Sequence, residues 1–379
     1  MKIERVLVVG GGIAGLAIAG GLTRAGIRCV IAERSKTWRP TGAGIILNVN
    51  AMAALDKLGL ANRVRDRGFR LRKGAITDRN GRNLAQTNFG VLDAEFGPTL
   101  SIHRAELHTA LLEGASAADI LLDTSLERMV QHADEVEVRL TNGREERFDL
   151  VIGADGIGSR VRELTFGHVP TEYSGYTCWR FVVDAQLEQS TMCEMWGRGK
   201  RFGVVPIGKN RFYIFAVANA ARDTPDPEPG RLERFRKKFS DFGGPVPTLL
   251  AALHDPNELL HNDLCAIPVG NWFDGRVVLI GDAAHAMTPN MGQGAGMALE
   301  DAAVLVELLK TGVEVSQALQ SYQARRAGRV SWVQNQSRRI GQIGQLENAL
   351  ACRLRNTVLK LVPDRVSTSA LRRLVSQPI

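Results

Sequence analysis

Three glycines near the N-terminus are the first residues whose types and spacing could do chemistry. Gly10, Gly12 and Gly15 follow an apolar run at residues 5–9, and Glu33 lies eighteen residues after Gly15. Gly10 permits a tight turn, Gly12 lets the backbone approach a pyrophosphate, and Gly15 allows a helix to pack closely on a strand. Glu33 is placed to accept hydrogen bonds from ribose hydroxyls. The pattern predicts a dinucleotide site, but it does not separate NAD from FAD.

Two later segments each have an aspartate directly after a predicted buried strand. In residues 149–162 an apolar run leads to Asp155, and in residues 276–285 another leads to Asp282. A glycine-rich segment then opens a helix at about Gly292, and a helix start favours anions. Each aspartate turn, taken alone, is also compatible with a structural strand exit.

The hydrophobic pattern indicates the elements that must position these motifs. Apolar runs predict buried parallel strands at residues 5–9, 27–32, 150–154 and 276–280. Helical spacing predicts helices at residues 16–25, 50–60 and 104–114. Residues 171–267 are alternating and aromatic, which is typical of an antiparallel sheet, and the chain after Gly292 is helical. The sequence therefore predicts an α/β protein with a segmented nucleotide-binding domain, a middle sheet domain and a helical C-terminus.

Charge and cysteine content argue against several other classes of protein. The net charge of +8 is concentrated in residues 321–379, which carry +9, so a generally basic nucleic-acid-binding surface is not expected. The five cysteines contain no C-x-x-C pair and the histidines no H-E-x-x-H, so no metal is expected. No apolar stretch reaches about 18 residues and no signal peptide is present, so we expect a cytoplasmic protein.

The three motifs in this order resemble the flavoprotein monooxygenases of the para-hydroxybenzoate hydroxylase type. The resemblance implies a Rossmann-like FAD-binding domain of the glutathione-reductase type, an inserted antiparallel-sheet substrate domain and a C-terminal helical segment. It implies non-covalent FAD, with NADH or NADPH as co-substrate and no second nucleotide domain. The implied boundaries are 1–70, 98–170 and 268–320 for the FAD domain, 71–97 and 171–267 for the sheet domain, and 321–379 for the basic helices.

The same resemblance assigns residues to the cofactor. It implies that the glycine motif binds the ADP part, that Asp155 serves FAD and NAD(P)H, and that Asp282 holds the ribityl chain. It also implies that Arg104 reaches the flavin and that backbone near Leu126 touches the adenine. The implied cofactor residues are Gly10, Gly12, Ala14, Gly15, Glu33, Arg34, Ala43, Gly44, Arg104, Leu126, Asp155, Gly156, Asp282, Pro289, Gly292, Gly294 and Ala295.

Short identical stretches resemble the alkylquinolone hydroxylases within this family. They include Thr177-Cys178-Trp179-Arg180, His261-Asn262-Asp263-Leu264 and Gly281-Asp282-Ala283-Ala284-His285. The resemblance implies hydroxylation of an apolar bicyclic aromatic ring with O₂, through a C4a-hydroperoxyflavin. A hydroxylase of a small polar aromatic, of the urate, hydroxybenzoate or hydroxynicotinate type, stays open, as does a non-oxygenating flavoprotein of the same fold.

Arg201, Tyr213 and Pro289 are the catalytic candidates. Arg201 and Tyr213 lie twelve residues apart across a predicted hairpin and match positions in the urate and alkylquinolone hydroxylases. A cation beside a substrate oxygen favours its anion, although both side chains are also compatible with structural roles. Pro289 matches the position whose carbonyl lies near flavin C4a. We expect His285 to be structural, while Cys178 and Trp179 either line the substrate pocket or face the core.

The basic C-terminal segment carries apolar residues at helical spacing. One predicted face contains Trp332, Ile340, Ile343, Leu346 and Leu350, and another contains Leu354, Val358, Leu361 and Val362. Helices packed on the catalytic body with a solvated basic rim are the simpler interpretation. The alternative is a weak peripheral contact with an anionic membrane, and the oligomeric state stays open.

Overall fold

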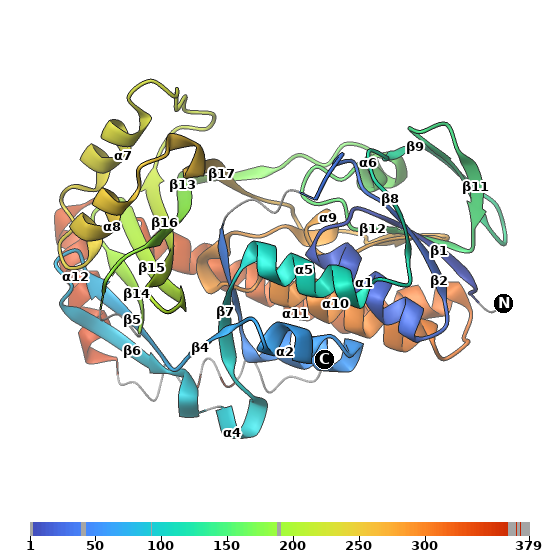
Figure 1. Ribbon diagram of the computed structural model, residues 1–379, viewed down its shortest axis with the longest axis horizontal. Coiled ribbons are helices and arrows are strands. Elements are labelled where there is room, and N and C mark those ends of the chain that lie inside the picture. Colours follow the sequence, from blue (N-terminus) through green and yellow to red (C-terminus); the bar gives the residue numbers. More distant parts are fainter. Residues whose placement is uncertain are drawn as a thin grey trace.

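The computed structural model of the protein describes residues 3–38, 43–91, 93–187, 191–362, 369 and 372. It has two lobes, one built on a parallel sheet and the other on a larger antiparallel sheet, joined by long strands and a long helix (Figure 1). Gly42 and most of the predicted C-terminal segment after residue 362 lie outside the described residues.

A six-stranded sheet forms the centre of the first lobe, because its strands are apolar on both faces. β1 pairs in parallel with β12 and β2, and only β18 runs antiparallel to its neighbour. The strands lie in the order β18 (Phe273–Asp274), β19 (Val277–Leu279), β12 (Leu150–Gly153), β1 (Arg5–Val9), β2 (Arg28–Ala32) and β8 (Asp119–Leu121). The four strands predicted from the apolar runs are therefore confirmed, with ends that differ by a residue or so.

Helices cover this sheet, and those at its centre are rich in Ala and Gly, which allow close packing. The helices of this lobe are α1 (Ile13–Arg24), α2 (Val49–Leu58), α3 (Ala61–Arg65), α5 (Arg104–Gly114), α6 (Arg160–Phe166), α9 (Asp282–His285), α10 (Gly294–Leu309) and α11 (Val315–Gly344). α10 is buried along nearly its whole length, so its polar residues must find partners inside the protein.

The second lobe contains a seven-stranded sheet with two different faces. Its order is β17 (Leu260–Ala266), β13 (Glu172–Asp184), β16 (Arg211–Asn219), β15 (Lys200–Gly208), β14 (Met192–Trp196), β5 (Lys73–Asp78) and β6 (Asn83–Asn88). On the outer face Trp179, Phe181 and Phe202 pack with α7 (Arg231–Phe239) and α8 (Val246–Ala252). We call the opposite side the inner face; from the strand register it carries Cys178, Arg180, Val182, Arg201, Gly203, Val205, Ile207, Tyr213, Phe215 and Val217.

Smaller elements complete the two lobes. One three-stranded sheet comprises β3 (Gly44–Leu47), β7 (Thr99–His103) and β4 (Phe69–Leu71), and another β11 (Glu145–Phe148), β10 (Val136–Leu140) and β9 (Leu126–Gln131). The remaining helices are α4 (Asp93–Phe96), α12 (Ala349–Leu361) and the 3₁₀ turns η1 (Phe89–Val91), η2 (Pro256–Glu258) and η3 (Pro289–Met291). Ser101 of β7 donates to the Pro206 carbonyl of β15, so the first of these sheets contacts both lobes. The exact domain boundaries stay a prediction.

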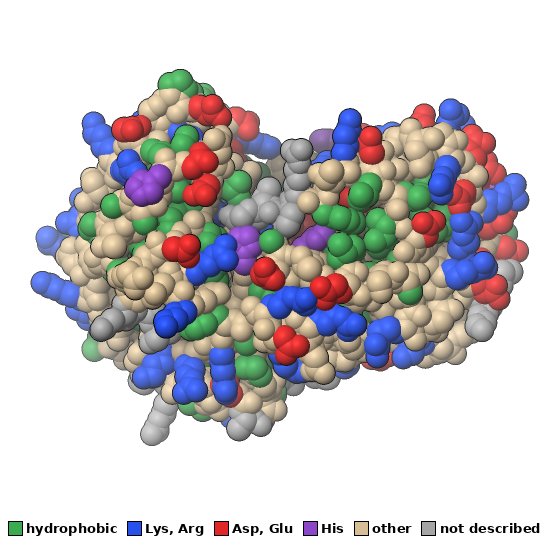
Figure 2. Space-filling view, in the orientation of Figure 1, with side chains coloured by type: hydrophobic (Ala, Val, Ile, Leu, Met, Phe, Trp, Pro, Cys, Tyr) green, Lys and Arg blue, Asp and Glu red, His purple; other side chains and the backbone are tan. Residues whose placement is uncertain are grey.

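The visible surface carries both signs of charge. Figure 2 shows Lys and Arg side chains intermingled with Asp and Glu over both lobes, without a continuous basic patch on this face. Within the described ranges, no helix is long and apolar enough to span a membrane.

A buried ionic network joins α10 to α11. Glu300 and Asp301 of α10 are fully buried, and Arg326 of α11 donates to both, with 2.8 Å from Nε to Asp301 Oδ1. Arg329 donates to both Glu300 oxygens at 2.7 Å. His285 Nε2 lies 2.6 Å from Asp301 Oδ2, which confirms a structural position for this histidine. Asp301 also accepts the Gly281 N–H at 2.9 Å, so the network reaches the loop before Asp282.

Replacing Arg326 with methionine should lower the free energy of unfolding by about 3–5 kcal/mol, because two buried carboxylates lose a cation. Arg325→Met is the matched control, since Arg325 is the next residue of α11 and pairs with Glu307 at the surface. The control should change by less than about 1 kcal/mol. Urea unfolding of both variants measures the difference, and equal effects would contradict the proposed importance of the network.

Candidate active site

Three loops meet at the carboxyl ends of the parallel strands. A Cβ at Gly10 would lie 2.5 Å from the Ala154 carbonyl oxygen, so the loops after β1 and β12 touch through backbone. Gly281, after β19, packs against Ala14 of α1, where an added Cβ would be 3.2 Å from the Ala14 Cβ. Ligands of open α/β sheets bind at this edge. The structure thus brings the three predicted motifs together in one crevice.

The two helix-side glycines of the first motif have different surroundings. An added Cβ at Gly15 would lie 1.8 Å from the Gly10 carbonyl oxygen, so the fold itself requires glycine there. An added Cβ at Gly12 would meet no heavy atom within 4 Å. Gly12 is also the N-cap of α1, where no side chain caps the helix N–H groups. Open space in front of free N–H groups is a suitable cradle for a pyrophosphate.

Glu33 lies at the end of β2 beside this cradle. Its carboxylate accepts the Gly11 N–H at 2.7 Å and the Ser35 N–H at 2.8 Å. Burial would raise its pKa, but the hydrogen bonds from Ser35 and Gly11 and the nearby Arg34 lower it, so the carboxylate stays ionised as an acceptor. Thr124 N–H donates to the Glu33 carbonyl at 2.9 Å, which places the segment leading to Leu126 nearby.

Two aromatic residues beside the glycine loop were missed by sequence reasoning. The Trp38 and His108 rings lie 4.8 Å apart, and His108 Nε2 lies 3.1 Å from the Gly11 carbonyl oxygen. A Cβ at Gly11 would be 2.6 Å from the Trp38 indole, so the ring covers the loop directly. Neither residue belongs to a recognisable motif, and only the fold brings them together.

Asp155 organises its own loop. Its carboxylate accepts the Ser159 hydroxyl at 2.5 Å and the Arg160 and Val161 N–H groups at 2.7 and 3.1 Å. Burial raises its pKa, and these hydrogen bonds oppose the rise. Gly156 and Gly158 face open space, so backbone as well as side chain is available to a ligand. The expected contact of Asp155 with the cofactor stays a prediction.

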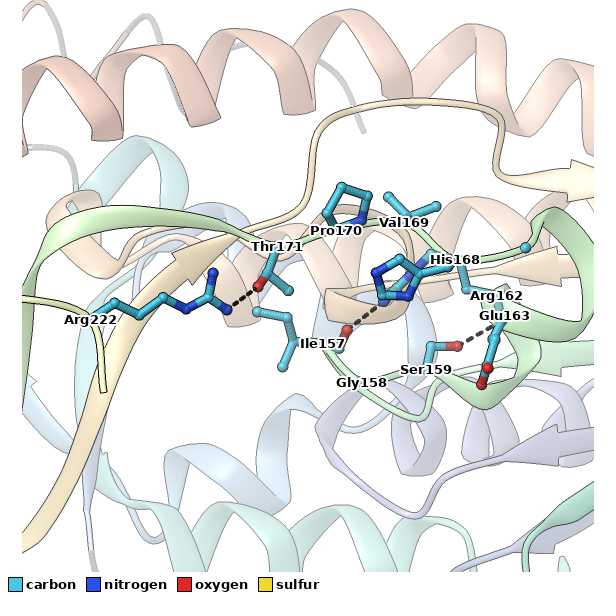
Figure 3. A pocket seen from close by; sticks show the side chains of 11 residues that line it. Ile157, Gly158, Ser159, Arg162, Glu163, His168, Val169, Pro170, Thr171 and Arg222 are labelled. Carbon is cyan, nitrogen blue, oxygen red and sulfur yellow. Dashed lines mark hydrogen bonds between the residues drawn. The ribbon is translucent and has the colours of Figure 1, made fainter. Parts of the chain in front are cut away.

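Arg162, from the same motif, ties this loop to the third motif. Its guanidinium donates to the Ala283 carbonyl at 2.7 Å and to the Ile157 carbonyl at 2.5 Å. A cavity of about 390 Å³ lies beside it, with His168 and Arg222 also on its wall. Figure 3 shows these side chains, and Arg222 donates a hydrogen bond to Thr171 at 3.1 Å. Three basic residues and the acidic Glu163 therefore border a cavity next to the Asp155 loop.

Arg104 lies between the cofactor crevice and the inner face. Within the described part of the chain its exposed guanidinium has no hydrogen-bond or ion-pair partner. Its charge nevertheless acts on two neighbours. Burial raises the pKa of the Asp282 carboxyl, and the nearby His285 and Arg104 oppose this rise. Arg104 also acts to lower the pKa of Tyr213, which burial raises. A cation so placed is available to a bound ligand.

The last predicted cofactor segment begins at Pro289, which is exposed at the start of η3. Gly292 follows in a left-handed conformation, with a φ of 60°, and its carbonyl accepts the Asn48 amide at 3.2 Å. A Cβ at Gly294 would meet nothing within 4 Å, while Ala295 lies in the first turn of α10. This helix start also faces open space.

Tyr213 lies where the inner face meets β3. An added Cβ at Gly44 would be 2.3 Å from the Tyr213 Cβ, so these two residues, both predicted, are in contact next to Ala43. Burial raises the Tyr213 pKa to about 12, opposed by the adjacent Arg180. Arg180 lies on the neighbouring strand, with its side chain beside the Tyr213 hydroxyl. The structure therefore pairs Tyr213 with Arg180, a residue not singled out from the sequence as catalytic.

Arg201 shares the inner face but not the position of Tyr213. It pairs across the hairpin with Val217, four residues from Tyr213, or about 13 Å along the strand. Its guanidinium is buried and donates to Gln345, Glu194 and Asn290 at 2.9, 2.9 and 2.7 Å. Arg201 and Tyr213 are therefore separated on the inner face, and α11 and the Asn290 turn enclose the arginine. The catalytic role expected for each residue stays a prediction.

The other two pocket candidates separate onto opposite faces of the sheet. Trp179 packs in the outer core, stacked on His261 at 4.6 Å, so it does not line the inner face. Cys178 faces inward beside Tyr176 and Val217 and is buried. Alternation along β13 decides both outcomes.

Two relatives match nearly the whole chain. It is 39% identical over 380 residues to the aurachin C monooxygenase/isomerase of Stigmatella aurantiaca, with 99% of this chain and 98% of that protein covered. It is 38% identical over 362 residues to the 2-heptyl-3-hydroxy-4(1H)-quinolone synthase of Pseudomonas aeruginosa, with 95% and 94% covered. The crystal structure of Klebsiella pneumoniae HpxO complexed with FAD and uric acid matches with a TM-score of 0.91 at 27% identity, covering 98% of this chain and 96% of that one.

Gly12→Ala should leave the unfolding free energy nearly unchanged but weaken FAD binding at least about tenfold, because its Cβ would occupy the pyrophosphate cradle. Gly15→Ala should instead destabilise the apoprotein by about 1–3 kcal/mol through its clash with Gly10. Flavin fluorescence titration and urea unfolding measure the two effects. Unchanged FAD affinity in Gly12→Ala would contradict the assignment of the cradle.

A family profile described as an FAD binding domain matches residues 4–337. The matched region contains the glycine cradle, the ionised Glu33, the Asp155 loop and the unpartnered Arg104 described above, all of which fit a flavin dinucleotide. Together with relatives at 38–39% identity, this shows that the chain belongs to the family of FAD-dependent aromatic monooxygenases, with FAD as its cofactor.

Proposed function

We propose that the protein uses NAD(P)H and O₂ to hydroxylate an apolar bicyclic aromatic heterocycle of the alkylquinolone type. The observation that carries this proposal is the composition of the inner face. Its residues are mainly apolar, including Val182, Val205 and Phe215, while Arg180 and the Tyr213 hydroxyl supply polar groups beside Gly44. A mostly apolar pocket with a few polar groups fits a hydrophobic ring system with one or two heteroatoms.

The relatives support the same substrate class. Two of them, at 38–39% identity, are named for aurachin C and for a heptyl-substituted quinolone. The chemistry that FAD supplies when bound is hydride acceptance from NAD(P)H and activation of O₂. The residues of this chain must then orient the ring, exclude water and make the ring electron-rich.

Arg180 and Tyr213 are the side chains that we propose for activating the ring. Burial holds the pKa of Tyr213 near 12, so the phenol remains protonated and donates a hydrogen bond throughout the neutral and mildly alkaline range. The Arg180 guanidinium beside it supplies a positive charge. Together they favour negative charge on a ring oxo or hydroxyl oxygen, which pushes electron density into the ring.

Arg201 has a different role in this proposal. Its donation to Asn290 connects β15 to η3, in which Asn290 directly follows Pro289. Asn290 also donates to the Tyr176 hydroxyl and the Ser337 carbonyl, at 2.9 and 2.8 Å. We therefore assign Arg201 as a positioning residue that holds the Pro289 segment against the inner face.

The co-substrate and the location complete the proposal. The cavity bordered by Arg162, His168 and Arg222 adjoins the Asp155 loop and supports an anionic dinucleotide as co-substrate, without separating NADH from NADPH. All five cysteines are free, which supports the cytoplasmic location predicted from the sequence.

A substrate panel tests the proposal directly. Purified holoenzyme should oxidise NAD(P)H in step with formation of a product heavier by one oxygen atom when given a 2-alkyl-4-quinolone. It should act at least about a hundredfold less efficiently on urate and on hydroxybenzoate, because neither can fill an apolar face. Coupled NAD(P)H consumption and product mass are the measurements, and preferred turnover of a small polar aromatic would reject the proposed class.

Arg180→Gln and Tyr213→Phe should each lower the hydroxylation rate by about a hundredfold while FAD affinity is retained, because each removes one group that stabilises ring charge. Arg201→Gln should lower the free energy of unfolding, because it leaves Glu194 without its cation. Since the Tyr213 pKa is raised, its titration should not produce a break in the pH–rate profile below about pH 10. Normal activity in Arg180→Gln would remove this arginine from the site.

A further inference from the structure

Helix α12 exposes an apolar stripe. Leu350, Leu354, Val358 and Leu361 of α12 are 72, 66, 51 and 75% exposed. They are half of the eight exposed large apolar side chains in the described part of the chain. Their spacing of four, four and three residues keeps them on one side of the helix. Such a concentration of exposed apolar surface marks an interaction site more often than chance exposure does.

The opposite side of α12 fixes the direction of this stripe. Arg355 is buried there, donates to the Gly197 and Gly344 carbonyls at 3.2 Å and lies 5.2 Å from the Trp196 ring. Cys352 is also buried, and Asn348 caps the helix by accepting the Leu350 and Ala351 N–H groups. The helix is therefore held by its inner side and presents the stripe outward without any rearrangement.

The charged side chains of α12 itself are all positive. α12 contains no acidic residue, and Arg353 and Lys360 are exposed along one edge of the stripe. Neither of them, nor exposed Arg339 at the end of α11, has an acidic partner among the residues that the structure describes. Glu347, before the helix, accepts a hydrogen bond from Asn219 instead. An apolar stripe edged only by cations complements a surface that is apolar inside and anionic outside.

Alternative occupants fit these charges less well. A second copy related by a twofold axis through the stripe would bring two sets of Arg353 and Lys360 together, and like charges repel at an interface. An anionic lipid surface instead offers phosphates to the cations and acyl chains to the leucines. Figure 1 shows α12 on the sheet lobe, at one end of the long axis of the molecule.

We propose that α12 is an interfacial helix that attaches the protein peripherally and reversibly to membranes containing anionic lipid. The stripe enters the boundary between headgroups and acyl chains, and Arg353 and Lys360 contact the headgroups. The attachment is independent of the substrate assignment, although it would hold the enzyme where poorly soluble aromatic compounds collect.

Co-sedimentation of the holoenzyme with vesicles tests this proposal. Vesicles of equal parts phosphatidylglycerol and phosphatidylcholine should bind the protein, and pure phosphatidylcholine should bind it much less. Leu350→Ser with Leu354→Ser should lower partitioning onto the anionic vesicles by about tenfold or more. Arg353→Gln with Lys360→Gln should remove the preference for anionic lipid and its dependence on salt.

Val313→Ser is the matched control, because Val313 is an exposed valine in the turn before α11, away from α12. It should bind vesicles as the unchanged protein does, and circular dichroism should show that every variant is folded. Absence of binding to anionic vesicles overturns the proposal, as does binding that ignores the leucine substitutions. Self-association that the leucine substitutions abolish, without vesicle binding, would assign the stripe to a second copy and also overturn it.

Discussion

Two neighbouring buried carboxylates constrain much of this structure. Glu300 and Asp301 lie on a helix with almost no solvent contact, and uncompensated charges there would be very unfavourable. Arg326 and Arg329 neutralise them, which locks α11 against α10, and the amide of Asn50 adds a 2.6 Å hydrogen bond from α2. Because Asp301 also accepts the Gly281 N–H and contacts His285, the same charges fix the loop that carries Asp282.

From this buried network, α11 extends to the antiparallel sheet of the second lobe. The helix runs thirty residues to Gly344. Near its end, glycine is required twice, since an added Cβ at Gly341 would lie 2.2 Å from the Tyr176 hydroxyl and one at Gly344 2.8 Å from the Arg201 side chain. One helix therefore touches both the cofactor loop and the antiparallel sheet. A disturbance of either contact should shift the loop before Asp282 relative to the inner face of the antiparallel sheet.

The sequence predicted those parts that are set locally. Strand, glycine turn and helix are neighbours along the chain, so the Gly10 to Glu33 unit could be recognised from its spacing. The antiparallel sheet could be recognised from the alternation of its strands. The surroundings of Arg201 could not, because its partners Gln345 and Asn290 lie 144 and 89 residues away. The hairpin that carries Arg201 and Tyr213 was predicted, yet strand geometry separates them and brings Arg180 to Tyr213 instead. Asn50 likewise lies inside α2, where a tertiary contact bonds it to Glu300, 250 residues away.

The basic C-terminal segment shows how far a charge count differs from a surface charge. Arg326 and Arg329 are buried against acids of α10, and Arg355 is buried against carbonyl groups and Trp196, so none of the three contributes an open cation. Burial lowers the pKa of Arg355, yet a guanidinium stays charged at any ordinary pH. Fewer cations of this segment remain exposed at the surface, and two of them, Arg353 and Lys360, lie along the edge of an exposed apolar stripe. The arrangement of the charge, rather than its total, distinguishes a membrane-facing helix from a generally basic surface.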